Sequence, residues 1–339
     1  MFEKVHTVPT ADELLDKAYS RAVRAGRGKI KEVTDKEELE ESMLLTAGNI
    51  IADNLRNTAG DWPSLDKMID FYKELTSILV GVDRLKMSLA SLDWAASKVK
   101  EISRKYVGMM RKSPDPVLVR KQAYGRISSI VYDIDKDLRF LNDARNKLRD
   151  LPDVKDEPTI VVAGYPNVGK SSFVTDITGA RPEIAQYPFT TKNVTIGHFV
   201  YKRKRYQVID TPGLLDRPLE ERNDIERQAI SALRHVGNVV LFILDPSETC
   251  GYTLGEQYHL LGEVKKFIQM PVLVAANKID VKGDEAEADV CMSTLTGERV
   301  MDVRDKLVEM IEAEAPKKKP EEPGVELPPS RKKKGDIKK

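Results

Sequence analysis

Apolar residues recur every three or four positions through most of the first 150 residues, as they do on one face of an amphipathic helix. Signals of β structure are almost absent there. One apolar stripe is formed by Leu65, Met68, Ile69, Tyr72, Leu75, Ile78 and Leu79. It continues as Leu85, Leu89, Leu92, Ala96, Val99, Ile102 and Tyr106. We therefore predict an antiparallel helical bundle over residues 1–150.

Capping and turn residues divide this bundle. Thr10-Ala-Asp-Glu13 and Thr34-Asp-Lys-Glu37 have the form of capping boxes, and Gly26-Arg-Gly28 and Gly60-Asp-Trp-Pro63 suggest breaks. These signals predict helices over about 11–25 and 35–58. Ser113-Pro-Asp-Pro116 interrupts the pattern again, and its Asp115 is expected to cap a long last helix from Val117 to about Arg149.

Trp94 lies close to the apolar stripe, so core packing is the favoured interpretation for it. Basic residues cluster at 98–112, 120–126 and 139–149. Composition does not distinguish solvated helix faces from an RNA-binding surface here, because both are rich in lysine and arginine.

From residue 159 the pattern changes, and short apolar runs alternate with segments of helical period. Strands are predicted at 159–163, 194–201, 205–209, 239–244, 272–276 and near Val290. Helices are predicted at 171–178, 219–235, 254–268 and 299–314. Strands that alternate with helices form a mostly parallel sheet covered on both faces. We predict an α/β domain over residues 159–315, joined to the bundle by a polar, proline-bounded linker at 151–158.

Two further segments are polar. Residues 179–193 are rich in turn formers and are expected to be a mobile loop. Residues 316–339 carry nine Lys or Arg against four Asp or Glu and few apolar residues, so a disordered tail is expected. Such a tail suits phosphate backbones at low salt, and a purely solubilising tail is the alternative.

Composition narrows the function classes. The 339 residues include 55 Lys and Arg and 54 Asp and Glu, a net charge of +1, so any contact with nucleic acid must be local. Cys250 and Cys291 have no neighbouring His cluster, which argues against a disulfide framework or a zinc site. The longest apolar run, Val239 to Leu244, is far shorter than the roughly 20 residues of a membrane span. We expect a soluble protein of the cytoplasm with no membrane segment.

The clearest chemical pattern follows the predicted strand at 159–163. The sequence G-x-x-x-x-G-K-S runs from Gly164 to Ser171, directly before a predicted helix. Such a loop surrounds a polyphosphate with backbone N–H groups, and the helix N-terminus favours the anion. Lys170 is expected against the β- and γ-phosphates and the Ser171 hydroxyl on Mg²⁺. Nucleotide contacts are expected from the whole loop: Gly164, Tyr165, Pro166, Asn167, Val168, Gly169, Lys170, Ser171 and Ser172.

Two more polar loops follow predicted strands, Asp210-Thr-Pro-Gly213 and Asn277-Lys-Ile-Asp280. The carboxyl ends of strands are where open α/β sheets bind ligands. A carboxylate at Asp280 accepts from both N1–H and the exocyclic amino group of guanine, whereas adenine would leave it unpaired. A backbone N–H of Ser293-Thr-Leu295 is expected near guanine O6. Nucleotide contacts are expected from Asn277, Lys278, Asp280, Ser293, Thr294 and Leu295.

With Thr190-Thr191, these segments resemble the five G motifs of a translation-factor-class GTPase. Gly164 to Ser171 and the stretch from Ala180-Arg-Pro to Thr191 are similar to the Obg-related branch. A helical bundle ahead of a P-loop GTPase domain resembles the nucleolar GTP-binding protein 1 family, in a short, archaeal-type form.

The resemblance implies a protein that binds GTP and GDP with Mg²⁺ and acts in large ribosomal subunit assembly. Ser171 and Thr191 would then coordinate the metal, Asp210 would hold it through water, and the Gly213 N–H would sense the γ-phosphate. Thr190 is the alternative to Thr191, because spacing cannot separate them. The implied partners are ribosomal RNA and large-subunit assembly intermediates, and off the ribosome we expect a monomer.

Leu214 stands where Ras-like GTPases use a glutamine that orients water, so slow intrinsic hydrolysis is expected, at or below about 10⁻⁴–10⁻² s⁻¹. The Asn167 side chain offers an oxygen that could hold a K⁺ ion, a hypothesis for what compensates. The expected catalytic residues are Lys170, Thr191, Gly213 and Asn167. The main alternative is a structural placeholder on pre-ribosomal RNA with little turnover, and an ATP-using P-loop protein is a more distant one.

Overall fold

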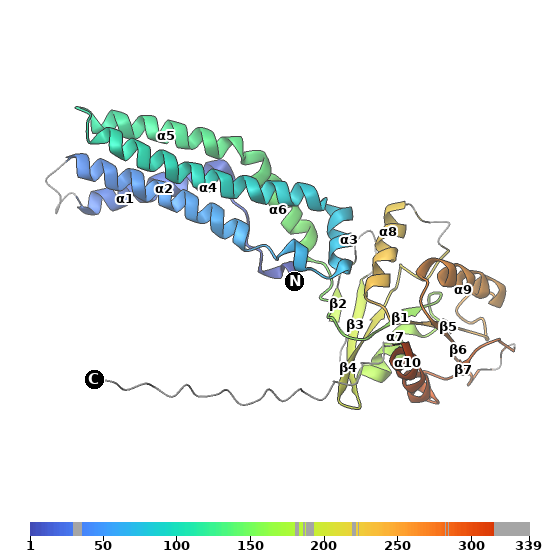
Figure 1. Ribbon diagram of the computed structural model, residues 1–339. Coiled ribbons are helices and arrows are strands. Elements are labelled where there is room, and N and C mark those ends of the chain that lie inside the picture. The colour runs from blue at the N-terminus through green and yellow to red at the C-terminus, as the bar shows by residue number, and fades with distance from the viewer. Residues whose placement is uncertain are drawn as a thin grey trace, which may run out of the picture.

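The computed structural model describes residues 1–29, 36–179, 183–185, 187, 193–218, 222, 224–281, 283 and 285–314 of the chain. An elongated helical part leads into an α/β part, and the two meet at one end of the helices (Figure 1). The predicted fold class, an α/β domain preceded by an all-α domain, is confirmed. The predicted tail at 316–339 lies outside the described residues.

The helical part contains α1 (Ala11–Lys29), α2 (Lys36–Gly60), α3 (Asp70–Leu79), α4 (Val82–Met110), α5 (Pro116–Asp133) and α6 (Asp135–Arg149). Short 3-10 turns lie at Phe2–Lys4 and Leu65–Lys67. Helices α1, α2, α4 and α5 lie side by side, whereas α3 and α6 lie toward the α/β part (Figure 1). Among the described helices, none combines the length and apolar character that a bilayer crossing requires.

Local capping signals are confirmed where the structure describes them. The Thr10 N–H donates to the Glu13 carboxylate over 2.9 Å and the Glu13 N–H donates to the Thr10 hydroxyl, as a capping box requires. Asp115 accepts from the Leu118 N–H and caps α5, with proline at its first position. Thr34 of the second proposed box lies outside the described residues.

Three helix boundaries differ from the sequence prediction. Helix α1 continues through Gly26, where an added Cβ would lie 2.8 Å from the Met43 sulfur, so this glycine serves close helix packing. The apolar stripe that runs past residue 79 is broken at Gly81, whose φ of 79° turns the chain between α3 and α4. The predicted helix 117–149 is likewise divided at Ile134 into α5 and α6. Apolar spacing misses both breaks because it keeps its period across them.

Three large apolar side chains of α4 face solvent, and the last of them, Met109, is 43% exposed. Met87 is 73% exposed and Trp94 is 47% exposed, and their seven-residue separation places them on the same side of the helix. The interpretation of Trp94 as a core residue is therefore wrong. The buried stripe of α4 passes instead through Leu92, Ala95 and Val99, and Trp94 lies beside it.

The α/β part is built on a 7-stranded sheet in the order β2-β3-β4-β1-β5-β6-β7. The strands are β1 (Thr159–Ala163), β2 (Glu183–Ala185), β3 (Val194–Tyr201), β4 (Lys204–Asp210), β5 (Val239–Leu244), β6 (Val272–Ala276) and β7 (Val290–Cys291). Strands β4, β1, β5, β6 and β7 pair in parallel, while β3 pairs antiparallel with both β4 and β2. Both β1 and β5 are buried throughout, which accounts for their unbroken apolar sequences.

Helices cover both faces of the sheet. They are α7 (Lys170–Thr178), α8 (Asp224–Ala232), α9 (Leu254–Ile268) and α10 (Val300–Glu314), and a 3-10 turn at Leu233–His235 extends α8. Figure 1 shows α8 and α9 on one side of the sheet and α7 and α10 on the other. Strand β2 was not predicted, because Glu183 and Ile184 are exposed and carry no apolar alternation.

Helix α3 joins the two parts of the molecule. The buried Tyr72 hydroxyl donates to the Pro152 carbonyl over 2.7 Å and accepts from the Val154 N–H over 2.9 Å. Glu74 pairs with His235, which follows α8, at 2.7 Å. The predicted linker is thus packed against α3 over part of its length, with Val154 only 5% exposed.

Candidate functional site

The loop after β1 requires glycine at two positions. Gly164 and Gly169 have φ angles of 131° and 105°, which residues with a Cβ rarely adopt. An added Cβ would lie 2.5 Å from the Ile243 carbonyl oxygen at Gly164 and 2.1 Å from the Asn277 side-chain nitrogen at Gly169. The loop therefore presses against its neighbours on both sides, and α7 begins directly after it at Lys170.

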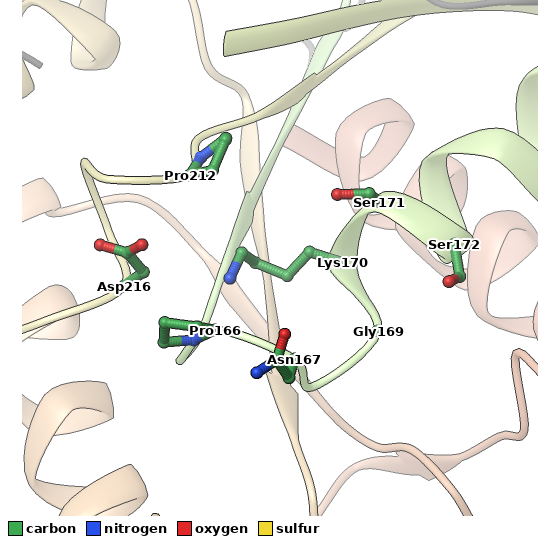
Figure 2. Close-up of a pocket in the computed structure, with 8 residues that line it drawn as sticks. All are labelled: Pro166, Asn167, Gly169, Lys170, Ser171, Ser172, Pro212 and Asp216. Atoms are coloured by element: carbon green, nitrogen blue, oxygen red, sulfur yellow. The ribbon is translucent and has the colours of Figure 1, made fainter. Parts of the chain in front are cut away.

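A cavity of about 410 Å³ lies over this loop (Figure 2). Its lining is Pro166, Asn167, Gly169, Lys170, Ser171, Ser172, Pro212 and Asp216. Tyr165 and Val168, although expected among the contacts, turn their side chains away. The Tyr165 ring stacks on Tyr252 at 4.0 Å, and Val168 is fully buried.

The Lys170 ammonium group lies inside the loop that it follows. Its Nζ donates to the carbonyl oxygens of Gly164 and Tyr165, both over 2.8 Å, and the residue is only 6% exposed. A buried cation next to a helix N-terminus attracts an oxyanion, which would replace the two carbonyl oxygens as acceptors.

Ser171 and Asp210 bring two oxygen ligands together at the edge of the cavity. The Ser171 hydroxyl donates to Asp210 Oδ2 over 2.6 Å, and Asp210 is fully buried. Within the described part of the chain, Asp210 Oδ1 is buried without a hydrogen-bond partner. Burial raises the pKa of Asp210, against the opposing effects of the Ser171 hydrogen bond and the Lys170 charge. A hard divalent cation such as Mg²⁺ fits this oxygen pair, because it would supply the missing partner and the missing positive charge.

Thr190 and Thr191, the other expected metal ligands, lie outside the described residues. The geometry therefore bears on two of the three proposed ligands, Ser171 and Asp210, and leaves the threonines as predictions.

The segment after β4 is closed on itself. The Gly213 N–H donates to Asp216 Oδ2 over 2.7 Å, and Arg222 donates to the Gly213 carbonyl over 2.9 Å. The Leu215 carbonyl accepts from the Gly164 N–H over 3.0 Å, which ties this segment to the phosphate loop. Leu214 is 1% exposed, so its side chain belongs to the core.

Asn277 connects three loops. Its side-chain nitrogen donates to the Val168 carbonyl over 2.8 Å and to the Thr294 hydroxyl over 2.9 Å. Its side-chain oxygen accepts from the Thr294 N–H over 2.9 Å. Fully buried, Asn277 positions the phosphate loop and the Thr294 loop relative to each other.

Lys278 and Asp245 form an ion pair between the loops that follow β6 and β5. Lys278 has a φ of 62° and its ammonium group lies 2.6 Å from the buried Asp245 carboxylate. Although burial of Asp245 acts to raise its pKa, hydrogen bonds from Lys278 and Ser247 lower it overall. Sequence reasoning did not single out Asp245, yet its place directly after β5 is the same signal that marked Asp210 and Asn277.

Asp280 is the exposed member of this group. Its carboxylate accepts a hydrogen bond from the Ser293 hydroxyl, which joins the loop from Asn277 to Asp280 to the loop from Ser293 to Leu295. The Thr294 N–H is engaged by Asn277, and Leu295 is 84% exposed at the rim. Asp280 is thus held by Ser293 while it stays exposed, so its carboxylate can accept further hydrogen bonds.

Two residues that sequence reasoning missed, Asp216 and Arg222, surround Gly213. Asp216 is 5% exposed and Arg222 is 3% exposed, and Arg222 lies 3.6 Å from the Asp216 carboxylate. No local pattern marks them, because only the folded turn brings position 222 back to position 213.

The chain is similar to known proteins over most of its length. The family described as NOG1 N-terminal helical domain matches residues 2–155, and the one described as Nucleolar GTP-binding protein 1 (NOG1) matches residues 224–280. An uncharacterised protein of Methanocaldococcus jannaschii is 42% identical over 295 residues, which covers 84% of this chain and 82% of that protein.

Named relatives are longer. Nucleolar GTP-binding protein 1 of Encephalitozoon cuniculi is 38% identical over 274 residues, which covers 79% of this chain and 52% of that protein. This chain spans about half the length of such relatives. The crystal structure of a nucleolar GTP-binding protein 1 from Plasmodium falciparum is 37% identical, with 48% of this chain and 91% of that chain covered and a TM-score of 0.42.

Both halves of the chain therefore match the same family, and three relatives exceed 35% identity across most of this chain. The protein belongs to the nucleolar GTP-binding protein 1 family.

Proposed function

We propose that this protein binds GTP and GDP with Mg²⁺ and hydrolyses GTP to GDP and phosphate. The observation that carries the proposal is the convergence of loops at the carboxyl ends of β1, β4 and β6. Direct hydrogen bonds join them, from Ser171 to Asp210 and from Asn277 to Val168 and Thr294.

The phosphate end of the nucleotide would lie in the cavity over the loop from Gly164 to Ser171. Lys170 supplies a positive charge there, and it would exchange its two carbonyl acceptors for phosphate oxygens. Ser171 and Asp210 supply the oxygen ligands for Mg²⁺, which would neutralise the β- and γ-phosphate charge. Thr191, or Thr190, would complete the metal site.

The base end would lie at Asp280. A carboxylate can accept the two N–H groups that guanine offers and adenine does not, and the Ser293 hydroxyl holds Asp280. Replacing Asp280 by Asn should move the base preference away from guanine in nucleotide-binding titrations. Unchanged discrimination would show that Asp280 does not read the base, and a wild-type chain that prefers adenine nucleotides would argue for an ATP-using protein instead.

Hydrolysis would be slow without assistance. The buried Leu214 side chain cannot orient a water molecule, and we expect turnover at or below about 10⁻⁴–10⁻² s⁻¹. Asn167, at the cavity wall, would hold a K⁺ ion beside the phosphates. Equal rates of GTP turnover in KCl and in NaCl would rule out a role for K⁺ held by Asn167.

Its biological role would be a step in large ribosomal subunit assembly in the cytoplasm, with the monomeric protein docking on ribosomal RNA through its helical part. Family membership and the basic helices support this role. Cross-linking the protein in cells and sequencing the attached RNA tests it. A placeholder with little turnover is the second candidate, favoured by Leu214, and it predicts no stimulation of GTP turnover by ribosomal particles.

The binding test is a titration of the purified chain with GDP and with the slowly hydrolysed analogue GTPγS, with Mg²⁺ and with EDTA. Lys170→Ala should weaken binding of both by at least about a hundredfold, because charge-assisted hydrogen bonds to phosphate are lost. The matched control is Lys202→Ala, an exposed lysine in the turn between β3 and β4, which should leave both affinities unchanged. No magnesium-dependent affinity in the wild-type chain would contradict the proposed function.

A further inference from the structure

Gly213 carries the amide that would sense a γ-phosphate, and a carboxylate of the same chain already holds that amide. The Gly213 N–H donates to Asp216 Oδ2 over 2.7 Å. On the other side of the Gly213 residue, Arg222 donates to its carbonyl over 2.9 Å. Arg222 also lies 3.6 Å from Asp216 Oδ1, so the two side chains close a ring around Gly213.

This ring is buried and faces the phosphate site. Asp216 and Arg222 are 5% and 3% exposed, and Asp216 is part of the cavity lining. In Figure 2, Asp216 lies on the opposite side of the cavity from Ser171 and Ser172, and the Lys170 side chain extends between them. A carboxylate in this position has the charge sign and acceptor chemistry of a phosphate oxygen.

We propose that Asp216 is a built-in competitor of the γ-phosphate, which makes it the residue that sets the preference of the site between GDP and GTP. This inference rests on the proposed function. One N–H cannot donate full hydrogen bonds to two anions, and two like charges in one cavity repel each other strongly where water is scarce. A γ-phosphate at Gly213 therefore requires the Asp216 carboxylate to leave.

GDP has no such conflict. Its terminal β-phosphate is bound by the loop from Gly164 to Ser171, so the ring around Gly213 can stay closed. GTP binding would open the ring, and Arg222 would lose the carboxylate that holds it. The energetic difference between the two nucleotides then includes the breaking of the contacts of Asp216 with Gly213 and Arg222.

The test compares affinities for GDP and GTPγS, each with Mg²⁺, in the full chain. Asp216→Asn keeps the size of the side chain and an acceptor for Gly213 but removes the charge, so affinity for GTPγS should rise about tenfold while affinity for GDP changes less than twofold. Asp216→Ser is the second variant, should the first not fold, and predicts the same direction. Asp302→Asn, an exposed carboxylate at the start of α10, is the matched control and should leave both affinities unchanged.

Limited trypsin digestion of the wild-type chain gives a readout that needs no variant. Trypsin must take the arginine side chain into its own pocket, and Arg222 is buried while the ring is closed. Cleavage after Arg222 should therefore be faster with Mg²⁺ and GTPγS than with Mg²⁺ and GDP.

The outcomes separate the two proposals. If the wild-type chain binds neither nucleotide, the proposed function itself fails. If it binds both and the Asp216 variants change the two affinities by the same factor, or not at all, the competitor role is overturned. Equal cleavage at Arg222 in the two nucleotide states also counts against it.

Discussion

The buried side-chain amide of Asn277 joins the phosphate loop to the Thr294 loop. It contacts the Val168 carbonyl and both the hydroxyl and the N–H of Thr294. The sequence predicted Asn277 among the residues that bind the nucleotide. Its structural function follows from burial, because a fully buried amide must find its partners within the protein.

Replacing Asn277 by Ala should weaken GDP and GTPγS binding alike. The Val168 carbonyl and the Thr294 N–H would lose a buried partner, at about 1–3 kcal/mol for each group left unsatisfied. We expect both affinities to fall by at least about tenfold in calorimetric titrations. A change confined to one nucleotide, or none, would show that Asn277 does not position the loops.

At the residue scale, sequence reasoning was strongest where spacing itself carries chemistry. The positive φ angles of Gly164 and Gly169 and the proximity of Ser171 to Asp210 agree with the expected phosphate loop. It failed for Asp216 and Arg222, because their meeting around Gly213 depends on the path of the chain after the D-T-P-G segment. Trp94 was misjudged for a simpler reason, since one helical position separates a core residue from an exposed one.

Among the elements, close helix packing in the bundle depends on small residues. Gly48 of α2 faces Ser103 of α4, and an added Cβ would lie 2.2 Å from the serine oxygen. Ser103 is 3% exposed and donates to its own helix at the Val99 carbonyl, so it cannot readily move aside. At Gly108, also in α4, an added Cβ would meet no atom within 4 Å.

Gly48→Ala and Gly108→Ala should therefore differ in their effect on the free energy of unfolding. The first should lower the free energy of unfolding by about 1–3 kcal/mol through overpacking. The second should leave it unchanged or raise it by up to about 1 kcal/mol, because alanine favours the helix over glycine. Urea unfolding followed by circular dichroism measures both, and equal effects would contradict the close packing of α2 on α4.

Element prediction succeeded where an apolar run ends at turn residues. Strands β5 and β6 and helix α9 have the predicted bounds. Prediction failed at Gly81 and Ile134, where apolar spacing continues across a bend that packing imposes. It also failed at β2, whose pairing with β3 is a long-range contact with no local apolar signal.

For the molecule as a whole, the Tyr72 hydroxyl links α3 to the segment that connects the two parts. It is buried, it bonds Pro152 and Val154, and burial raises its pKa far above the usual value. Tyr132 is a natural comparison, because its hydroxyl bonds Asp12 while the residue is 52% exposed.

Tyr72→Phe should lower the free energy of unfolding by about 1–3 kcal/mol, because the Val154 N–H loses its buried acceptor. It should also speed trypsin cleavage after Lys155, as the connecting segment loosens. Tyr132→Phe should change neither quantity, since water replaces its partner. Equal effects of the two variants in thermal unfolding and digestion would rule out the linking role of Tyr72.

Tyr187 is another contact between α3 and the α/β part. It belongs to the stretch between β2 and β3 that also contains Thr190 and Thr191, and it is 3% exposed. Its hydroxyl donates to the Ala229 carbonyl of α8 over 2.7 Å, and its ring lies 6.3 Å from that of Phe71 in α3. Cutting the chain at residue 151 would strip away Phe71 and uncover this aromatic face. Nucleotide affinities measured on such a truncated fragment would describe a chain in which Tyr187 has lost its packing against α3, so we expect them to differ from those of the full chain.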